Sequence, residues 1–179
     1  MVFKRRVIKN YWSIWAISRS SRFLYKKMTN NIDFSKSLKI VEFWPWDWVF
    51  TDKILNKITN DSKIYIFEID KWFCEILKEK YKNETKIKVF EESACNIENY
   101  FKENEIDIII SSLPLAFIDK SIVEEILKKS KKVLKNNWEY IQYQYFLQNK
   151  KQIKSHFSRV NYKFTFLNFP PAFVYLCKK

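Results

Sequence analysis

The sequence predicts a doubly wound α/β domain with a mostly parallel, seven-stranded sheet that ends in an antiparallel edge hairpin. Apolar, β-branched runs alternate with amphipathic helical stretches along the chain, which is typical of a parallel sheet with helices on both faces. Residues 106–111 form a nearly continuous apolar run, as expected for a strand buried on both faces. Only a short segment containing Pro170 and Pro171 separates the last two runs, which favours the edge hairpin.

Each element is expected from its own local pattern. Runs rich in β-branched and aromatic residues predict strands at 38–43, 63–70, 86–90, 106–111, 139–146, 162–167 and 173–177. Apolar residues at helical spacing predict helices at 49–58, 72–81, 97–101, 121–134 and 150–157. The segment RSSRFLYKKM predicts a further helix, because Phe23, Leu24 and Met28 can share one face and Ser20 or Ser21 can cap it.

Length and charge indicate one domain with an anionic partner. The 179 residues, 47% of them hydrophobic, suffice for one folded domain, with residues 1–36 as a basic N-terminal helical segment. Neither a membrane span nor a secretory signal is recognisable, so we expect a cytoplasmic protein. The net charge of +13 favours attraction to RNA, DNA or an acidic membrane surface. A lysine-rich composition imposed by an AT-rich genome would produce the same charge.

Metal chemistry is not expected. Cys74, Cys95 and Cys177 are far apart, and His156 is the single histidine of the chain. This spacing offers neither a CxxC pair nor a zinc site. We therefore expect no metal cofactor. Separately, we expect the protein to be a monomer.

The chain contains no glycine and seven tryptophans, whereas glycine usually makes up about 7% of a protein. An α/β domain needs glycine where its backbone takes positive φ. Tryptophans stand at such places: after the first strand, in a connector near the N-terminus, and after Asn136-Asn137, where a turn favours Asn-Gly. They are Trp44, Trp46, Trp48, Trp12, Trp15 and Trp138. We interpret all seven tryptophans as UGA codons that encode glycine in the native protein.

The segment from Val41 to Trp48, VEFWPWDW, lies between the first predicted strand and the first predicted helix. With glycine at its three tryptophans it becomes V-E-F-G-P-G-D-G, which resembles motif I of class I S-adenosylmethionine-dependent methyltransferases. Glycines there permit a tight turn and close approach of a cofactor, and the following helix start favours anionic groups. As written, the indoles would fill the bend, so we expect the tryptophan-bearing chain to bind the cofactor poorly.

Acidic and small residues follow the next two strands. Glu68 ends the second strand about 20 residues beyond the bend, where an acid accepts hydrogen bonds from ribose hydroxyls in nucleotide-binding folds; Asp70 is the nearby alternative. After the third strand, Ser93 stands where related families carry an acid near the adenine, and Glu92 could substitute. The predicted cofactor-binding residues are Glu42, Trp44, Pro45, Trp46, Asp47, Trp48, Glu68, Ile69, Ser93, Ala94 and Ser111.

The fourth strand runs into SSLPL at residues 111–115. In class I methyltransferases this strand end faces the transferred methyl group. Amino-group methyltransferases often carry a polar residue, then x-Pro-aromatic, which orients the amine and stacks on a base. Here Leu115 follows the proline, so base stacking is lost unless Phe117 compensates.

These segments together resemble the bacterial phospholipid N-methyltransferase family over essentially the whole chain. That family carries Gly-Ala-Ile/Ser-Ser-Arg, V-E-x-G-x-G-x-G, S-G-L-P-L, Q-x-x-Y and N-x-P-P-A segments. Their counterparts here are Ala16-Ile17 with Ser20-Ser21-Arg22, then residues 41–48, 111–115, 142–145 and 168–172. Ser112 replaces the glycine of S-G-L-P-L.

The resemblance implies methyl transfer from S-adenosylmethionine to the amine of phosphatidylethanolamine or a related lipid. The catalytic candidates are Ser111, Leu113, Pro114, Tyr143 and Tyr145, with Tyr25 as a further group that could orient the amine. The basic, partly apolar N-terminus would lie on an anionic membrane at its inner face.

Two alternatives remain at this point. An RNA adenine N6-methyltransferase of the ribosomal dimethylase type shares motif I, the Glu68-Ile69-Asp70 strand end and an x-L-P-x element, and a charge of +13 suits RNA. The other is a degenerate methyltransferase fold that acts as a basic binding module.

Overall fold

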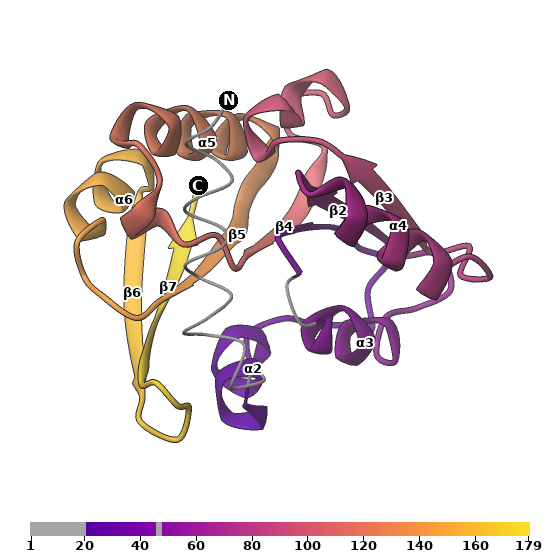
Figure 1. Ribbon diagram of the computed structural model, residues 1–179. Helices are drawn as coiled ribbons and strands as arrows, with labels where there is room; N and C mark the ends of the chain where they lie inside the picture. The colour runs from indigo at the N-terminus through magenta and orange to yellow at the C-terminus, as the bar shows by residue number, and fades with distance from the viewer. Residues whose placement is uncertain (1–20, 46–47) are drawn as a thin grey trace.

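The computed structural model describes residues 21–45 and 48–179. Seven strands form one sheet, in the order β3-β2-β1-β4-β5-β7-β6 (Figure 1). The strands are β1 Lys39–Phe43, β2 Lys63–Glu68, β3 Ile87–Glu91, β4 Ile106–Ser111, β5 Leu134–Gln144, β6 Arg159–Thr165 and β7 Ala172–Lys178. The first five strands are parallel, whereas β7 is antiparallel to both β5 and β6. The predicted fold class is confirmed.

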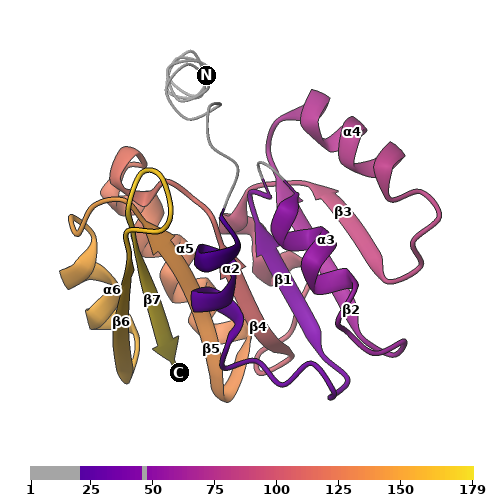
Figure 2. The same cartoon turned by 90° about the horizontal axis from the view of Figure 1, so that it is seen from below.

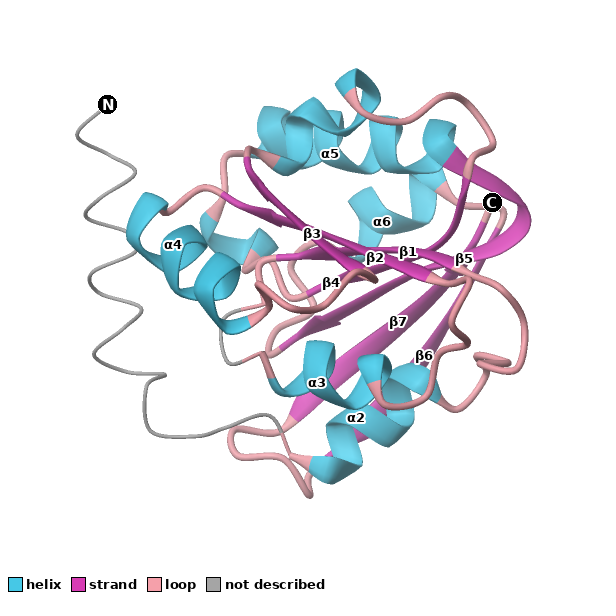
Figure 3. Ribbon diagram, turned by 90° about the vertical axis from the view of Figure 1, so that its right-hand side faces the viewer, coloured by secondary structure: helices cyan, strands magenta, loops and turns pink. Residues whose placement is uncertain are grey.

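Helices cover both faces of the sheet. The helices are α2 Arg22–Thr29, α3 Val49–Leu55, α4 Lys71–Lys80, α5 Lys120–Val133 and α6 Lys150–His156, with 3-10 turns η1 Ala94–Asn99 and η2 Leu115–Phe117. Helices α2 and α3 lie on one face, and α5 and α6 lie on the other (Figure 3). Each face has its own apolar core. The cluster that joins α2, α3 and α4 to the sheet is called the α2–α3 core, and the cluster that joins η1, α5 and α6 to it is called the α5–α6 core.

Alternation along the strands assigns side chains to these two cores. In β1, Ile40 packs in the α2–α3 core, and its neighbour Val41 packs in the α5–α6 core. Successive side chains of a strand point to opposite faces. The same alternation decides which strand-end residues can meet.

Helix α2 begins where a cap was expected. Ser21 is the N-cap, and its hydroxyl accepts a hydrogen bond from Leu24 N–H at 3.1 Å. Leu24 and Met28 are fully buried in the α2–α3 core. Helix α2 lies on the sheet face, where it contacts β5, β7 and β6 (Figure 2).

Three local predictions were wrong. The strand predicted at 139–146 begins earlier, at Leu134, and the helix before it ends at Val133. The turn expected at Trp138 is an irregularity within β5, where Asn137, not Trp138, has a positive φ of 67°. The helix predicted at 97–101 is a 3-10 turn that begins at Ala94.

No helix among residues 21–45 and 48–179 is long and apolar enough to cross a membrane. Residues 1–20, which include the expected membrane-contacting segment with Trp12 and Trp15, lie outside the described residues.

Candidate active site

The carboxyl ends of four parallel strands meet at one edge of the sheet. Phe43 of β1 lies opposite Phe67 of β2 and Ser111 of β4, and Glu68 lies opposite Glu91 at the end of β3. In open α/β sheets, ligands bind outside the carboxyl ends of the strands, where the strand order reverses. Here the order reverses between β1 and β4, so the predicted cofactor and substrate residues share the expected edge.

The bend after β1 requires an unusual backbone. Trp44 has a φ of 56° and Trp48 a φ of 42°, both in the left-handed region. The Trp44 N–H donates to the Phe67 carbonyl at 3.0 Å, and the Trp48 N–H donates to the Pro45 carbonyl at 2.9 Å. Left-handed backbone costs a residue with a Cβ roughly 1–2 kcal/mol, whereas glycine adopts it freely. Trp46 and Asp47 lie outside the described residues.

The Trp48 indole packs beside the start of α3. It stacks on Phe73 of α4 with ring centroids 5.8 Å apart, and Lys80 Nζ lies 5.8 Å from its ring centre. Trp48 is the N-cap residue of α3 and makes no side-chain cap bond. A large side chain therefore occupies the turn in which the motif requires bare backbone.

Glu42 ties the end of β1 to α3. Its side chain is fully buried, and its Oε2 accepts a hydrogen bond from the Thr51 hydroxyl at 2.6 Å. This contact orients the first turn of α3 against the strand that precedes the bend.

Glu68 is the carboxylate best placed to receive a cofactor. Its Oε1 accepts hydrogen bonds from the N–H groups of Ile69 at 2.7 Å and Asp70 at 2.9 Å. Its Oε2 is buried and has no hydrogen-bond partner among the described residues. Burial raises the pKa of Glu68 to about 7. A buried acceptor costs free energy unless a donor reaches it, so ribose hydroxyls fit this atom.

Asp70, the alternative acid, has a structural task. It is the N-cap of α4, and its Oδ1 accepts a hydrogen bond from Phe73 N–H at 2.9 Å. Glu68 is therefore the stronger candidate of the two. Ile69, between them, is 48% exposed.

The side chains that follow β3 form hydrogen bonds with η1. Ser93 caps η1, with its hydroxyl accepting from Cys95 N–H at 3.3 Å. Glu92 Oε1 accepts from Asn96 Nδ2 at 3.0 Å, and Ala94 is buried. Ser93 thus acts as a helix cap, and Glu92 is the acid that lies at this strand end.

The SSLPL segment is held by two glutamines that the sequence did not single out for this role. The Leu113 carbonyl accepts hydrogen bonds from Gln142 Nε2 at 3.0 Å and from Gln144 Nε2 at 2.7 Å. Leu113 N–H donates to the buried Ser111 hydroxyl at 3.3 Å. The only signal in the sequence is a Q-x-Q pair, whose amides share one strand face. These bonds fix the loop that carries Pro114 after β4.

Tyr143 and Tyr145 lie on the opposite face from Ser111. The Tyr143 ring stacks on Phe50 of α3 with centroids 6.4 Å apart, and it meets Tyr145 edge-on at 5.7 Å. Gln142 pairs with Ser111 in the register, so its side chain points to the same face as Ser111 and away from that of Tyr143. The structure therefore separates the predicted catalytic set: Ser111, Leu113 and Pro114 form one group, and the tyrosines pack in the α2–α3 core.

Tyr25 packs in the same apolar core as Tyr143 and Tyr145. Its ring packs on Phe50 at 5.7 Å, its hydroxyl donates to the Lys53 carbonyl at 3.3 Å, and burial raises its pKa. Leu115 is fully buried, whereas Phe117 is 48% exposed.

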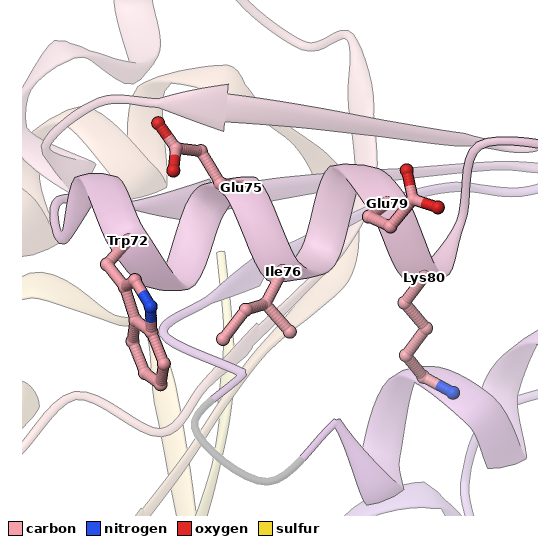
Figure 4. Close-up of a pocket in the computed structure, with 5 residues that line it drawn as sticks. All are labelled: Trp72, Glu75, Ile76, Glu79 and Lys80. Atoms are coloured by element: carbon pink, nitrogen blue, oxygen red, sulfur yellow. The ribbon is translucent and has the colours of Figure 1, made fainter.

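A separate hollow lies on α4 and contains none of these groups. It is lined by Trp72, Glu75, Ile76, Glu79 and Lys80. Figure 4 shows Lys80 reaching toward α3, where its Nζ lies 3.1 Å from Asp52 Oδ1. The hollow is a feature of the helix surface and plays no part in the predicted site.

Residues 19–137 match the family model of ribosomal RNA adenine dimethylase. The chain belongs to this family. It is also 23% identical to an ornithine lipid N-methyltransferase of Singulisphaera acidiphila, over 99% of this chain and 94% of that protein. The family match ends near the start of β5, but the lipid-enzyme match extends through the last strand.

Solved structures share the fold of this ribosomal RNA adenine dimethylase family member. A S-adenosylmethionine-dependent methyltransferase from Aquifex aeolicus has a TM-score of 0.69 at 10% identity, over 98% of this chain and 95% of that one. The 23S rRNA methyltransferase ErmE has a TM-score of 0.62 at 12% identity, over 90% of this chain and 69% of that one.

The chain is a S-adenosylmethionine-dependent methyltransferase. The family and the named relative favour this conclusion over the non-catalytic binding module. Among residues 21–45 and 48–179, no cluster of histidine, cysteine or acidic side chains could hold a metal ion.

Proposed function

We propose that the protein methylates the amine of a membrane lipid of the phosphatidylethanolamine type, acting as a monomer at the inner face of the membrane. The main support is the extent of the similarity to the ornithine lipid N-methyltransferase. That similarity includes residues 138–179, which lie beyond the family match. The second support is the set of lipid-family segments, above all SSLPL and NFPPA, at two strand ends on one edge.

The residues at this edge have positioning roles. S-adenosylmethionine, when bound, supplies an electrophilic methyl group. Glu68 Oε2 would accept hydrogen bonds from its ribose hydroxyls, and the backbone of the bend after β1 would hold the cofactor against the sheet edge. Ser111 and the loop held by Gln142 and Gln144 orient the lipid amine. Rates rise when the two reacting groups are held in line and water is excluded.

The amine must be neutral to attack, and the part of the chain that the structure describes places no strong base beside Ser111. Burial raises the pKa of Tyr140, whose hydroxyl donates to Gln142 Oε1 at 2.8 Å. A phenol whose pKa is raised does not ionise near neutral pH. The neutral amine therefore forms by proton loss to solvent before the lipid enters, and the site selects it.

The same proposal includes glycine at the seven tryptophan positions. Two of the four described tryptophans, Trp44 and Trp48, have positive φ. The other two are Trp72, 64% exposed on α4, and Trp138, next to Asn137 in β5. Asparagine tolerates left-handed backbone, as at Asn104 and Asn137, but a bulky tryptophan is poorly suited to it and glycine adopts it freely. Reading the seven codons in the gene tests this: UGG at Trp44 and Trp48 would overturn it.

The substrate test uses the seven-glycine protein with labelled S-adenosylmethionine. We expect label in phosphatidylethanolamine or ornithine lipid presented in vesicles, identified by mass spectrometry. Label in ribosomal RNA adenine, with none in the lipid, would overturn the lipid assignment and leave the enzyme class intact.

RNA adenine methylation is the second candidate, because the family is named for it. Its structural difficulty is Leu115, which is fully buried where an aromatic residue would stack on the base. The exposed Phe117, two residues on, is the only nearby ring on that segment. A Phe117→Ala variant that loses RNA methylation would support this candidate.

A further inference from the structure

The acidic residues are confined to the middle of the chain. All 20 of them lie between Asp33 and Glu139, whereas lysine and arginine extend from end to end. After Glu139 the chain has only basic charges, at Lys150, Lys151, Lys154, Arg159, Lys163, Lys178 and Lys179. The net charge of +13 is therefore carried by the two ends of the sequence.

The fold brings the start of α2 and the β6–β7 loop together. Ser21 N–H, at the start of α2, donates to Asn168 Oδ1 at 3.0 Å, across 147 residues of sequence. Asn168 is 3% exposed, and its Nδ2 donates to the Pro170 carbonyl at 2.8 Å. The side-chain oxygen of Asn168 therefore bonds the β6–β7 loop to α2, and its side-chain nitrogen bonds the loop to itself. Arg22 directly follows the contact.

The β6–β7 loop exposes large apolar side chains. Phe166 is 74% exposed, Leu167 is 55% exposed and Phe169 is 77% exposed. Phe164 supports them from β6, with its ring 6.0 Å from Phe166 and 4.8 Å from Phe173. Exposed apolar patches of this kind mark interaction surfaces. The loop projects beyond the sheet beside α2 (Figures 1 and 2).

This loop lies at the active-site edge. Ala172, the first residue of β7, pairs with Thr165, and Phe173 pairs with Gln144 at the carboxyl end of β5. Gln144 holds the Leu113 carbonyl of the SSLPL loop. A surface that touches the loop tip is therefore next to the substrate-positioning segment. Phe146 and Leu147, just after β5, are also exposed there.

The distribution of charge around the tip favours a lipid surface. Residues 164–173 contain no charged side chain, and Lys163 and Arg22 stand at the flanks. An uncharged apolar tip with flanking cations suits a bilayer, in which apolar groups enter the interface and cations meet headgroups. Platforms for single-stranded nucleic acid instead place aromatic rings along a positively charged groove.

We infer that the β6–β7 loop inserts Phe166, Leu167 and Phe169 into an anionic phospholipid bilayer and so presents the SSLPL loop to lipid headgroups. This rests on the proposed function and names the surface that the enzyme works on. It assigns membrane attachment to the described C-terminal loop, in addition to the basic N-terminal segment.

The test compares vesicle binding of three proteins in the seven-glycine form. They are the unsubstituted chain, the Phe166→Ser/Phe169→Ser variant and the matched control Ile122→Ser, which alters a 38% exposed residue on α5. Co-sedimentation uses phosphatidylcholine vesicles with and without phosphatidylglycerol. We expect the loop variant to lose at least about 10-fold in binding to the anionic vesicles, and the control to bind normally. The conservative variant Phe166→Leu/Phe169→Leu should retain most of the binding.

Two further measurements separate this inference from the substrate assignment. Methyl transfer to a short-chain, water-soluble phosphatidylethanolamine should be equal in the loop variant and the unsubstituted chain. Unchanged vesicle binding by the loop variant would overturn the inference even if lipid is methylated. Loss of RNA binding with unchanged vesicle binding would overturn it in favour of an RNA surface, and self-association lost in the variant would overturn it in favour of a second copy.

Discussion

Strands β1, β2 and β5 end, and β7 begins, at the same edge of the sheet. The β1–β2 half and the β5–β7 half of the sheet differ in the side chains that they place there. The β1–β2 half ends in buried carboxylates, with Glu42 fully buried and Glu68 2% exposed. The β5–β7 half has no acid after Glu139 and ends in exposed phenylalanines. The family match covers the first half and stops at residue 137. We propose that the part covered by the family match holds the cofactor, and that the β5–β7 half contributes to the choice of substrate.

The largest expected effect concerns the bend in the first half. Trp44→Gly/Trp46→Gly/Trp48→Gly should tighten binding of S-adenosylmethionine by at least about 100-fold, because glycine removes the indoles and relieves left-handed strain. Isothermal titration of both chains measures this. Trp72→Gly, on the surface of α4, is the control and should leave affinity unchanged. Micromolar binding by the tryptophan-bearing chain would refute the prediction.

The next effect concerns Glu68. Glu68→Gln should weaken cofactor binding about 10-fold, since a buried charge-assisted hydrogen bond is lost. The pKa of Glu68 is raised to about 7, so binding to the unsubstituted protein should strengthen as pH rises through that value. The variant should show no such rise. Titration across this pH range checks both points, with Glu75→Gln, an exposed residue on α4, as the control.

The same pKa has a consequence for stability, with a definite sign. Burial raises the pKa of Glu68 from 4.5 to about 7, so the folded protein holds this proton more tightly than the unfolded chain does. The stabilisation is fully present below the ordinary pKa and is lost as pH rises toward 7. Glu68→Gln should therefore flatten the pH dependence of urea unfolding in that window. An unchanged profile would show that Glu68 does not carry the shift.

A smaller effect is expected where the two halves are joined. Gln144→Leu removes one of the two amides on the Leu113 carbonyl and should cost about 1 kcal/mol of stability. It should lower kcat roughly 10-fold, because the SSLPL loop is less precisely held, with cofactor affinity unchanged. Gln148→Leu, on an exposed glutamine, serves as control. An equal loss of cofactor affinity would mean that the two halves are not separable.

The smallest effect concerns α2, which attaches to the second half through Ser21. Ser21→Ala removes the N-cap acceptor and should lower the free energy of unfolding by about 1 kcal/mol, while Ser21→Asn should retain it. Urea unfolding of the three proteins distinguishes these outcomes. Identical stability of the alanine variant would show that core packing and the Asn168 contact hold this helix without the cap.

Local sequence patterns were sufficient for the features that depend on near neighbours. Alternation of apolar runs and helical spacing predicted the parallel sheet, its edge hairpin and a cap at Ser20 or Ser21, of which the structure uses Ser21. The bend after β1 was found because tryptophan stood where only glycine is suited. The start of β5 was missed, because Asn136-Asn137 is typical of a turn and the sheet instead absorbs these residues in a strand irregularity next to β4.

The site needed the tertiary structure in two respects. Which face a strand-end side chain takes depends on the exact register, so Ser111 and Tyr143 were grouped from sequence although they lie on opposite sides of the sheet. The bonds from Gln142 and Gln144 to Leu113 span 29 and 31 residues, a separation that no local pattern reports.

The sequence by itself determined the fold class and the bend that requires bare backbone, because these follow from periodicity and from the φ values open to each residue, whereas the strand order came from the structure. Only the tertiary structure decided that Glu68 has a buried acceptor atom without a partner among the described residues, and that the start of α2 is bonded to an exposed aromatic loop. Burial and contacts between distant segments arise when the chain packs, and they have no signature in any short stretch of it.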